Sequence, residues 1–349
     1  MSAITSVTST RISPKWWAAC AGAVLLALIL GISIGAVAIP PNQTALELLS
    51  RIPGLGIHSG LSEIDAAIIW DLRLPRVVLA LVVGSMLASA GTAYQGTFRN
   101  PLADPYLLGV SAGAGLGATV EIVIFQSPAR WSLPVAAFLG ALIAVSLTYA
   151  LGRSSIAGRS ATSLVLAGVA VAALLTAAQT LVQQRNSDKV REVYAWILGR
   201  LAVGGWSDLA LVAPYVLVCT VVLLRYRRVL DVFAVGDEEA TTLGLPVGRA
   251  RAVIILAASL GTAAAVAVTG LIGFVGIIVP HTLRLIAGNS YRKLLPLSAI
   301  FGGVFLVLAD IIARTAMSPQ EIPIGVVTAL FGAPVFLYIL ASNKEGALV

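Results

Sequence analysis

Long apolar runs separated by short polar segments extend along the whole chain. Charge-free runs cover residues 16–46, 77–98, 105–120, 131–152, 160–184, 209–224, 252–283, 294–309 and 322–343. A helix needs roughly 20 apolar residues to cross the hydrocarbon core of a bilayer, so each run predicts at least one membrane-spanning helix. The run from 252 to 283 has 32 residues and is interrupted by Gly270, Gly273, Gly276 and Pro280, which predicts two helices.

This pattern predicts an all-α polytopic membrane protein that forms one transmembrane domain over residues 1–349. Ten transmembrane helices are expected, at about 16–39, 77–96, 105–125, 131–152, 161–184, 207–224, 251–269, 271–287, 294–313 and 323–342. The first apolar stretch is longer than the roughly 7–15 residues of a signal-peptide core, so we expect it to be retained as a helix.

Composition excludes the main soluble classes. Of the 349 residues, 58% are hydrophobic and 11% are charged, and the mean hydropathy is +0.95. A soluble domain carries about 25% charged residues, because its surface must be solvated. Lys and Arg exceed Asp and Glu by 23 to 16, but they lie singly or in pairs between apolar runs. A nucleic-acid reader would gather them in one stripe, so the excess of basic residues fits a membrane protein better.

The basic residues also predict an orientation. If the N-terminus is cytoplasmic, fourteen Lys and Arg residues fall in the inner segments and nine in the outer ones. Cytoplasmic loops carry the excess of positive charge in membrane proteins. We therefore expect both termini to be inside.

Catalytic and metal-binding motifs are missing from the sequence. It has no Gly-Lys pair, so it contains no loop of the kind that cradles a nucleotide phosphate. Two separated histidines, His58 and His281, and two cysteines in apolar runs, Cys20 and Cys219, predict neither a metal site nor a disulfide framework. We expect this chain to bind no cofactor and to be no enzyme by itself.

Glu121 lies within the third expected span, and Asp310 lies near the end of the ninth. Asp310 has Arg314 four residues later, which predicts a local ion pair on one helix face. Glu121 either lines a pore or sits near the membrane interface, and its spacing does not separate the two.

One internal segment, residues 230–248, is expected to form a cytoplasmic docking element. It contains Asp237, Glu238 and Glu239 at the start of a possible short helix, where the helix dipole favours acids. Gly244 can end that helix. A solvated loop is the alternative interpretation.

Longer strings in the sequence resemble a known family. They are RLPR at 73–76, QGTFRNPLADP at 95–105, LGVSAGA at 108–114, GLIGFVGIIVPH at 270–281, LAD at 308–310 and IPIGVVTALFGAPVF at 322–336. In this order and spacing the chain resembles the FecCD/BtuC family of permeases of type II ABC importers, from about residue 16 to 341.

The resemblance implies a BtuC-like ABC importer fold with ten helices, both termini inside, in the bacterial cytoplasmic (inner) membrane. It implies a homodimer, or a heterodimer with a related permease, with two ATPase subunits that bind ATP and Mg on the inner side. An extracytoplasmic substrate-binding protein docks on the outer side. The implied cargo is a metal chelate, with a ferric siderophore or another iron complex preferred and haem or cobalamin as alternatives.

The resemblance also places functional residues. Arg73, Arg76 and Arg314 are expected to be exposed on the outer face and to pair with acids of the binding protein. The residues expected to couple to the ATPase are Gly236, Asp237, Glu238, Glu239, Ala240, Leu243 and Gly244. The cytoplasmic gate is expected at Asn100, Leu102, Ser160, Thr162 and Ser163, and polar residues of the pathway at Thr176, Gln179 and Gln183.

Two other function classes remain open at this stage. A multi-span membrane enzyme would need clustered acids or histidines at one membrane face, and a secondary transporter would need coupling carboxylates near the midplane. Co-purification of an ATPase would separate the importer from both.

Overall fold

The computed structural model describes residues 12–54, 56, 58–154, 161–201 and 205–342, and within them the chain is helical without strands. The α-helices are α1 (Pro14–Ser33), α2 (Pro41–Ser50), α3 (Glu63–Ala67), α4 (Leu74–Phe98), α5 (Val110–Val120), α6 (Ser132–Ser154), α7 (Ala161–Gln184), α8 (Val190–Ile197), α9 (Trp206–Phe233), α10 (Asp237–Thr242), α11 (Val247–Thr269), α12 (Val275–Ala287), α13 (Tyr291–Thr315) and α14 (Ile324–Ser342). Short 3-10 and π turns complete them: η1 (Ile68–Arg73), η2 (Pro105–Leu108), η3 (Glu121–Phe125) and η4 (Ser187–Lys189).

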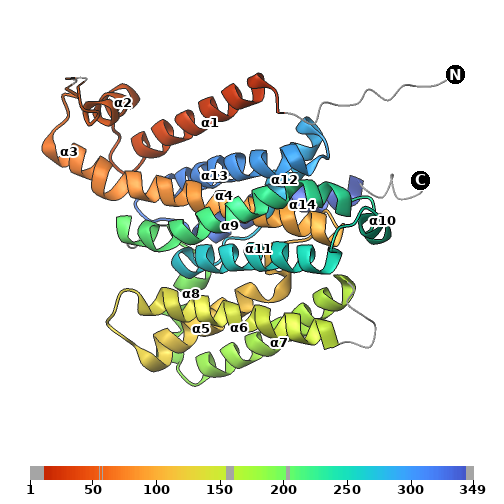
Figure 1. Cartoon of the computed structure of the whole chain (residues 1–349). Helices are drawn as coiled ribbons and strands as arrows, with labels where there is room; N and C mark the ends of the chain where they lie inside the picture. Colours follow the sequence, from red (N-terminus) through yellow and green to blue (C-terminus); the bar gives the residue numbers. More distant parts are fainter. Residues whose placement is uncertain (1–11, 55, 57, 155–160, 202–204, 343–349) are drawn as a thin grey trace.

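The long helices lie roughly side by side in one bundle (Figure 1). Helices α5, α6 and α7 form one edge of it, while α1 and α13 lie on the opposite side and α11 runs between the two groups. α4 packs against α9, α11, α12 and α13, and α11 also packs against α6. Because α4 and α11 have neighbours on most sides, they form the centre of the bundle.

The two ends of the bundle differ. The start of α1, the end of α14 and the short helix α10 lie at one end, while α2 and α3 lie at the opposite end (Figure 1). The segments predicted to be cytoplasmic and external therefore lie at opposite ends of the bundle. The start of α1 and the end of α14 lie at the same end.

Glycines let the central helices approach closely. A Cβ atom built on Gly84 of α4 would stand 2.3 Å from the carbonyl oxygen of Gly302 in α13, and one on Gly91 would stand 2.1 Å from that of Gly276 in α12. Small residues at helix crossings are typical of membrane bundles, where close van der Waals packing drives association. Gly84 and Gly91 thus serve the packing of α4 against α13 and α12.

Seven helices of the described residues are long and apolar enough to cross a membrane: α1, the segment Glu63–Phe98 that contains α4, α6, α7, α9, α11 and α13. Three further apolar helices are shorter, namely Val110–Phe125, Val275–Ala287 and Ile324–Tyr338. The expectation of an all-helical, multi-pass membrane protein is confirmed.

The start of α12 differs from the expected boundary of that span. The span expected from residue 271 starts only at Val275, because Gly270–Phe274 is not helical. The hydroxyl of Tyr106 donates to the Ile272 carbonyl and accepts from the Ile272 N–H, at 2.9 and 3.1 Å. These bonds satisfy backbone groups that a membrane interior otherwise leaves unpaired.

Candidate docking and coupling sites

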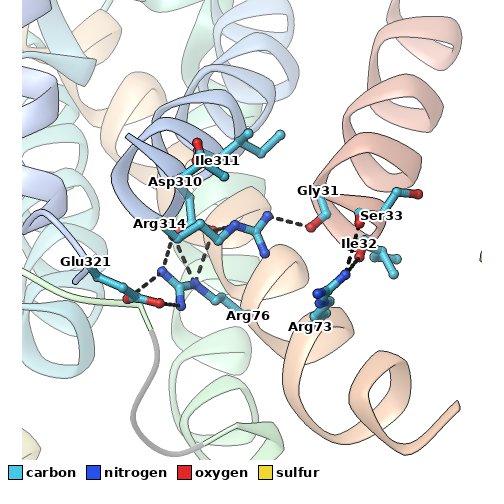
Figure 2. A network of polar contacts seen from close by, with 10 residues as sticks. Gly31, Ile32, Ser33, Arg73, Arg76, Asp310, Ile311, Arg314 and Glu321 are labelled. Carbon is cyan, nitrogen blue, oxygen red and sulfur yellow. Dashed lines mark hydrogen bonds and ion pairs between the residues drawn. The ribbon is translucent and has the colours of Figure 1, made fainter. Parts of the chain in front are cut away.

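Arg76, near the start of α4, lies at the centre of a charged cluster at the α2–α3 end of the bundle (Figure 2). Its Nε and Nη2 donate to Asp310 of α13 at 3.0 and 2.8 Å. Its Nη1 and Nη2 donate to the two carboxylate oxygens of Glu321 at 2.8 and 3.0 Å. One guanidinium therefore holds two carboxylates, in the forked geometry that makes Arg–carboxylate pairs strong.

The other two arginines of the cluster contact the end of α1. Arg73 donates to the carbonyls of Ile32 and Ser33 at 2.7 and 3.0 Å and to that of Val37. Arg314 donates to the Gly31 carbonyl. The last carbonyls of a helix have no partner within the helix, and cations stabilise that end. Arg73 and Arg314 thus cap the C-terminus of α1.

The expected exposure of these arginines is therefore wrong. Arg73 and Arg314 are each only 7% exposed, because they reach inward to the end of α1, and the Arg76 side chain is 12% exposed. The local pair predicted between Asp310 and Arg314 is present, with Nε and Oδ2 3.5 Å apart, but Asp310 binds Arg76 more closely. All three arginines line one open hollow of about 570 Å³ at this end of the bundle.

At the opposite end, α10 is a short acidic helix with defined caps. Gly236 precedes it with φ of +153°, where a side chain would collide with Glu239. After it, the Gly244 N–H donates to the Thr241 carbonyl and the Leu245 N–H to the Ala240 carbonyl. These two hydrogen bonds form the pattern of a helix end capped by glycine. Gly244 therefore terminates α10, as the sequence indicated.

α10 is fixed to the bundle on one side and free on the other. Ala240 is fully buried, whereas Val235 and Leu243 at its two ends are 68% and 70% exposed. Asp237, its first residue, accepts two hydrogen bonds from Arg251 of α11 at 2.8 and 2.9 Å and lies 3.9 Å from Arg99. Glu238 and Glu239 point to solvent as exposed residues. The helix presents an acidic and apolar surface and is tied to α11 and to the end of α4.

The predicted gate residues lie in two segments that the structure describes in part. Asn100 is exposed and its side-chain oxygen accepts from the Leu102 N–H at 2.9 Å, which closes a turn after α4. Ser160 lies outside the described residues. Thr162 is exposed at the start of α7, and Ser163 is 8% exposed.

The predicted pathway residues on α7 face different surroundings. Thr176 is exposed and Gln183 is half-buried. Gln179 is 8% exposed and packs against α5, where a Cβ built on Gly115 would stand 2.9 Å from its Oε1. Gln179 is therefore directed into a helix contact. A separate apolar groove of about 610 Å³ runs along α8 and α14 and includes Leu271.

Comparison with known proteins identifies the family. The family model described as the FecCD transport family matches residues 23–342. The chain belongs to the FecCD transport family. Its members are permease subunits of ABC importers, so the chain is a transport component and a multi-pass integral membrane protein.

Several relatives of the FecCD family cover most of the chain. The cobalamin import system permease protein BtuC of Halobacterium salinarum is 44% identical and covers 84% of this chain and 78% of its own. The hemin transport system permease protein HmuU of Yersinia pestis is 41% identical, covering 79% and 84%. The Fe(3+)-citrate import system permease protein YfmE of Bacillus subtilis is 37% identical, covering 89% and 90%.

The fold agrees with the FecCD assignment. A solved ABC transporter assigned to the metal-chelate type, in an inward-facing conformation, matches this structure with a TM-score of 0.82 and 28% sequence identity. The match covers 95% of this chain and 100% of the solved one. The expected BtuC-like architecture is thereby confirmed.

Two residues that complete these sites, Glu321 and Arg251, are not singled out by any pattern in the sequence. Each pairs with a residue that is distant along the chain, Glu321 with Arg76 and Arg251 with Asp237. For Glu321 the sequence offers only its position in the turn that follows Arg314.

Proposed function

We propose that this protein is the membrane permease of an ATP-driven importer for metal chelates, with a ferric siderophore or another iron complex as the preferred cargo. The observation that carries the proposal is α10. A short acidic helix with exposed apolar ends, tied to two spanning helices, fits a docking element for a separate ATPase. Relatives named for iron citrate, hemin and cobalamin support the cargo class.

The proposed topology has ten spans, made of the seven long apolar helices and the three shorter ones. Both termini and α10 face the cytoplasm, in agreement with the distribution of basic residues. α2, α3 and the hollow at Arg76 then face outward, in a bacterial inner membrane. We propose a homodimer or a heterodimer with a related permease, two ATPase subunits on the α10 side and a substrate-binding protein on the Arg76 side.

The proposed mechanism is alternating access. ATP, bound with Mg by the partner subunits, closes the ATPase pair and displaces α10, and the pair of Asp237 with Arg251 passes this displacement to α11 as a rigid body. Asn100, Leu102 and the start of α7 are proposed to form the inner gate. Thr176, Gln179 and Gln183 are proposed to contribute polar groups to the pathway, with Gln179 able to do so only after α5 and α7 separate.

Docking of the binding protein is proposed to centre on Arg76. Positively charged residues of membrane proteins are concentrated on the cytoplasmic side, so an arginine on the outer side calls for an explanation. Binding a carboxylate of a partner protein is a function that its guanidinium fits. Arg73 and Arg314 line the same hollow and hold the end of α1 in this conformation.

Uptake in a strain that lacks this chain tests the proposal, with iron-labelled siderophore, haem and cobalt-labelled cobalamin compared side by side. Loss of uptake of the iron-labelled siderophore supports both the transport class and the preferred cargo. Loss of cobalamin or haem uptake alone supports the importer class and contradicts the preferred cargo. Unchanged uptake of all three contradicts the proposal.

A further inference from the structure

Glu321 is the exposed member of the charged cluster. It lies in the turn between α13 and α14, and its side chain is 51% exposed, while Asp310 is 1% exposed. The residues from Ala316 to Glu321 are all exposed, so this turn can move without uncovering the core. The turn is attached at its end by the Ile322 N–H, which donates to the Ala313 carbonyl at 2.8 Å.

Glu321 occupies the side of Arg76 that an outside carboxylate would use. A guanidinium has five N–H donors in a fixed fork. The Nε of Arg76 and one hydrogen of Nη2 face Asp310, and Nη1 together with Nη2 faces Glu321. Since Asp310 is buried beneath Arg76, the outer edge of the guanidinium is reached only by replacing Glu321.

Charge favours such an exchange. Arg73, Arg76 and Arg314 carry three positive charges against the two negative charges of Asp310 and Glu321. When Glu321 swings away, the remaining buried group has two positive charges in excess at the edge of the hollow. The pKa of the Glu321 carboxyl is held below its usual range by the hydrogen bonds from Arg76, so Glu321 stays ionised and bound to Arg76 when no partner is present.

We infer that Glu321 is a built-in carboxylate that occupies the docking position on Arg76 and is exchanged for a carboxylate of an acidic protein partner. This inference rests on the proposed docking function of Arg76. The intramolecular pair reduces the positive excess of the cluster from two charges to one in the free permease, and it weakens docking because the partner must first displace a tethered competitor. The same competition rejects partners that do not offer a carboxylate.

The test uses the full chain in lipid nanodiscs and a fluorescein-labelled hexaglutamate peptide as the acidic probe, with binding followed by anisotropy. Glu321→Gln removes the competing charge and should tighten peptide binding roughly three- to tenfold. Glu63→Gln is the matched control, because Glu63 is an exposed acid of α3 at the same end of the bundle, and it should leave the affinity unchanged. Arg76→Gln should abolish the gain in a Glu321→Gln background.

A second measurement does not require the Arg76→Gln variant to fold. Phenylglyoxal labelling of Arg76, read by mass spectrometry, should rise in Glu321→Gln and fall when hexaglutamate is added. If Arg76→Gln loses peptide binding but Glu321→Gln binds no tighter than the wild type, the exchange is overturned and docking at Arg76 stands. If neither the wild type nor Glu321→Gln binds the peptide, or if binding persists without Arg76, the docking function itself is overturned together with the exchange.

Discussion

Arg76 and Asp310, 234 positions apart in the chain, form a buried ion pair with the Nη2 of one 2.8 Å from the Oδ1 of the other. The pair joins the start of α4 to the end of α13, and these two helices also approach closely at Gly84 and Gly302. Removing one member of a buried pair leaves an uncompensated charge, which costs more than the pair itself contributes. This relationship ties the charged cluster to the centre of the bundle.

Asp310→Asn should destabilise the protein strongly. The variant leaves Arg76 with Glu321 alone and Arg314 without its carboxylate, and loss of one member of a buried pair costs about 3–5 kcal/mol. Thermal unfolding in detergent, followed by tryptophan fluorescence, measures the effect. The control is Asp71→Asn, because Asp71 is an exposed acid that lines the same hollow. Equal unfolding temperatures for the two variants would contradict the role of the pair.

Gly91→Ala should push α4 and α12 apart. The added Cβ would stand 2.1 Å from the Gly276 carbonyl oxygen, and both partners are backbone, so neither can turn away. Overpacking of this kind costs about 1–3 kcal/mol. Gly22→Ala in α1 is the matched control, since a Cβ built there meets no atom within 4 Å. A Gly91→Ala protein as stable as Gly22→Ala would show that the two helices are not in contact.

Asp237→Asn should uncouple transport from ATP hydrolysis. The variant weakens the ties from α10 to Arg251 and Arg99 while leaving the exposed surface of α10 in place. Changes along a coupling element shift coupling by about 0.5–2 kcal/mol, so cargo imported per ATP hydrolysed should fall roughly two- to thirtyfold. Glu238→Gln, at an exposed position of the same helix, should keep more of that ratio. An unchanged ratio in Asp237→Asn would rule out the proposed transmission.

Asp104, in the turn between α4 and η2, predicts a pH dependence of stability. Burial raises the pKa of its carboxyl to about 6, against the opposing effect of the Tyr106 N–H that donates to it at 2.8 Å. A folded-state pKa above the usual value means that the folded protein binds more protons than the unfolded chain between about pH 4 and about pH 6. Stability therefore falls as the pH rises through this window.

Asp104→Asn keeps an oxygen acceptor for the Tyr106 N–H and removes the charge. The variant should unfold at a higher temperature than the wild type at a pH of about 7.5, and the difference should shrink by about pH 5. The measurement is the unfolding temperature of the wild type and of the variant at each of these two pH values. Asp188→Asn, at an exposed position, serves as the control and should show no such trend. A difference that grows as the pH falls would have the opposite sign to the one expected.

The helices were largely predictable because each depends on a local pattern. Apolar runs of sufficient length indicated the long spans, and the acids and glycine around α10 indicated where that helix lies. The start of α12 was not predictable, because the non-helical Gly270–Phe274 is stabilised by Tyr106, which is 166 positions away from Ile272. Periodicity carries no information about a partner at that distance.

The arginine cluster shows the same limit at the candidate site. The family resemblance predicted that Arg73, Arg76 and Arg314 act together, and in the structure all three line one hollow. Their burial could not be inferred, because it depends on where the end of α1 lies. The role of Glu321 as a partner of Arg76 depends likewise on how the turn after α13 folds back over α4.

Accumulation of cargo in right-side-out membrane vesicles tests the central claim most directly. Vesicles from cells with and without this chain are loaded with ATP, supplied with the binding protein and given a ferric siderophore that carries radioactive iron. The account predicts iron accumulation that requires both the chain and internal ATP and that persists when a protonophore collapses the proton gradient. Accumulation that survives removal of ATP but stops with the protonophore would contradict it and indicate a secondary transporter.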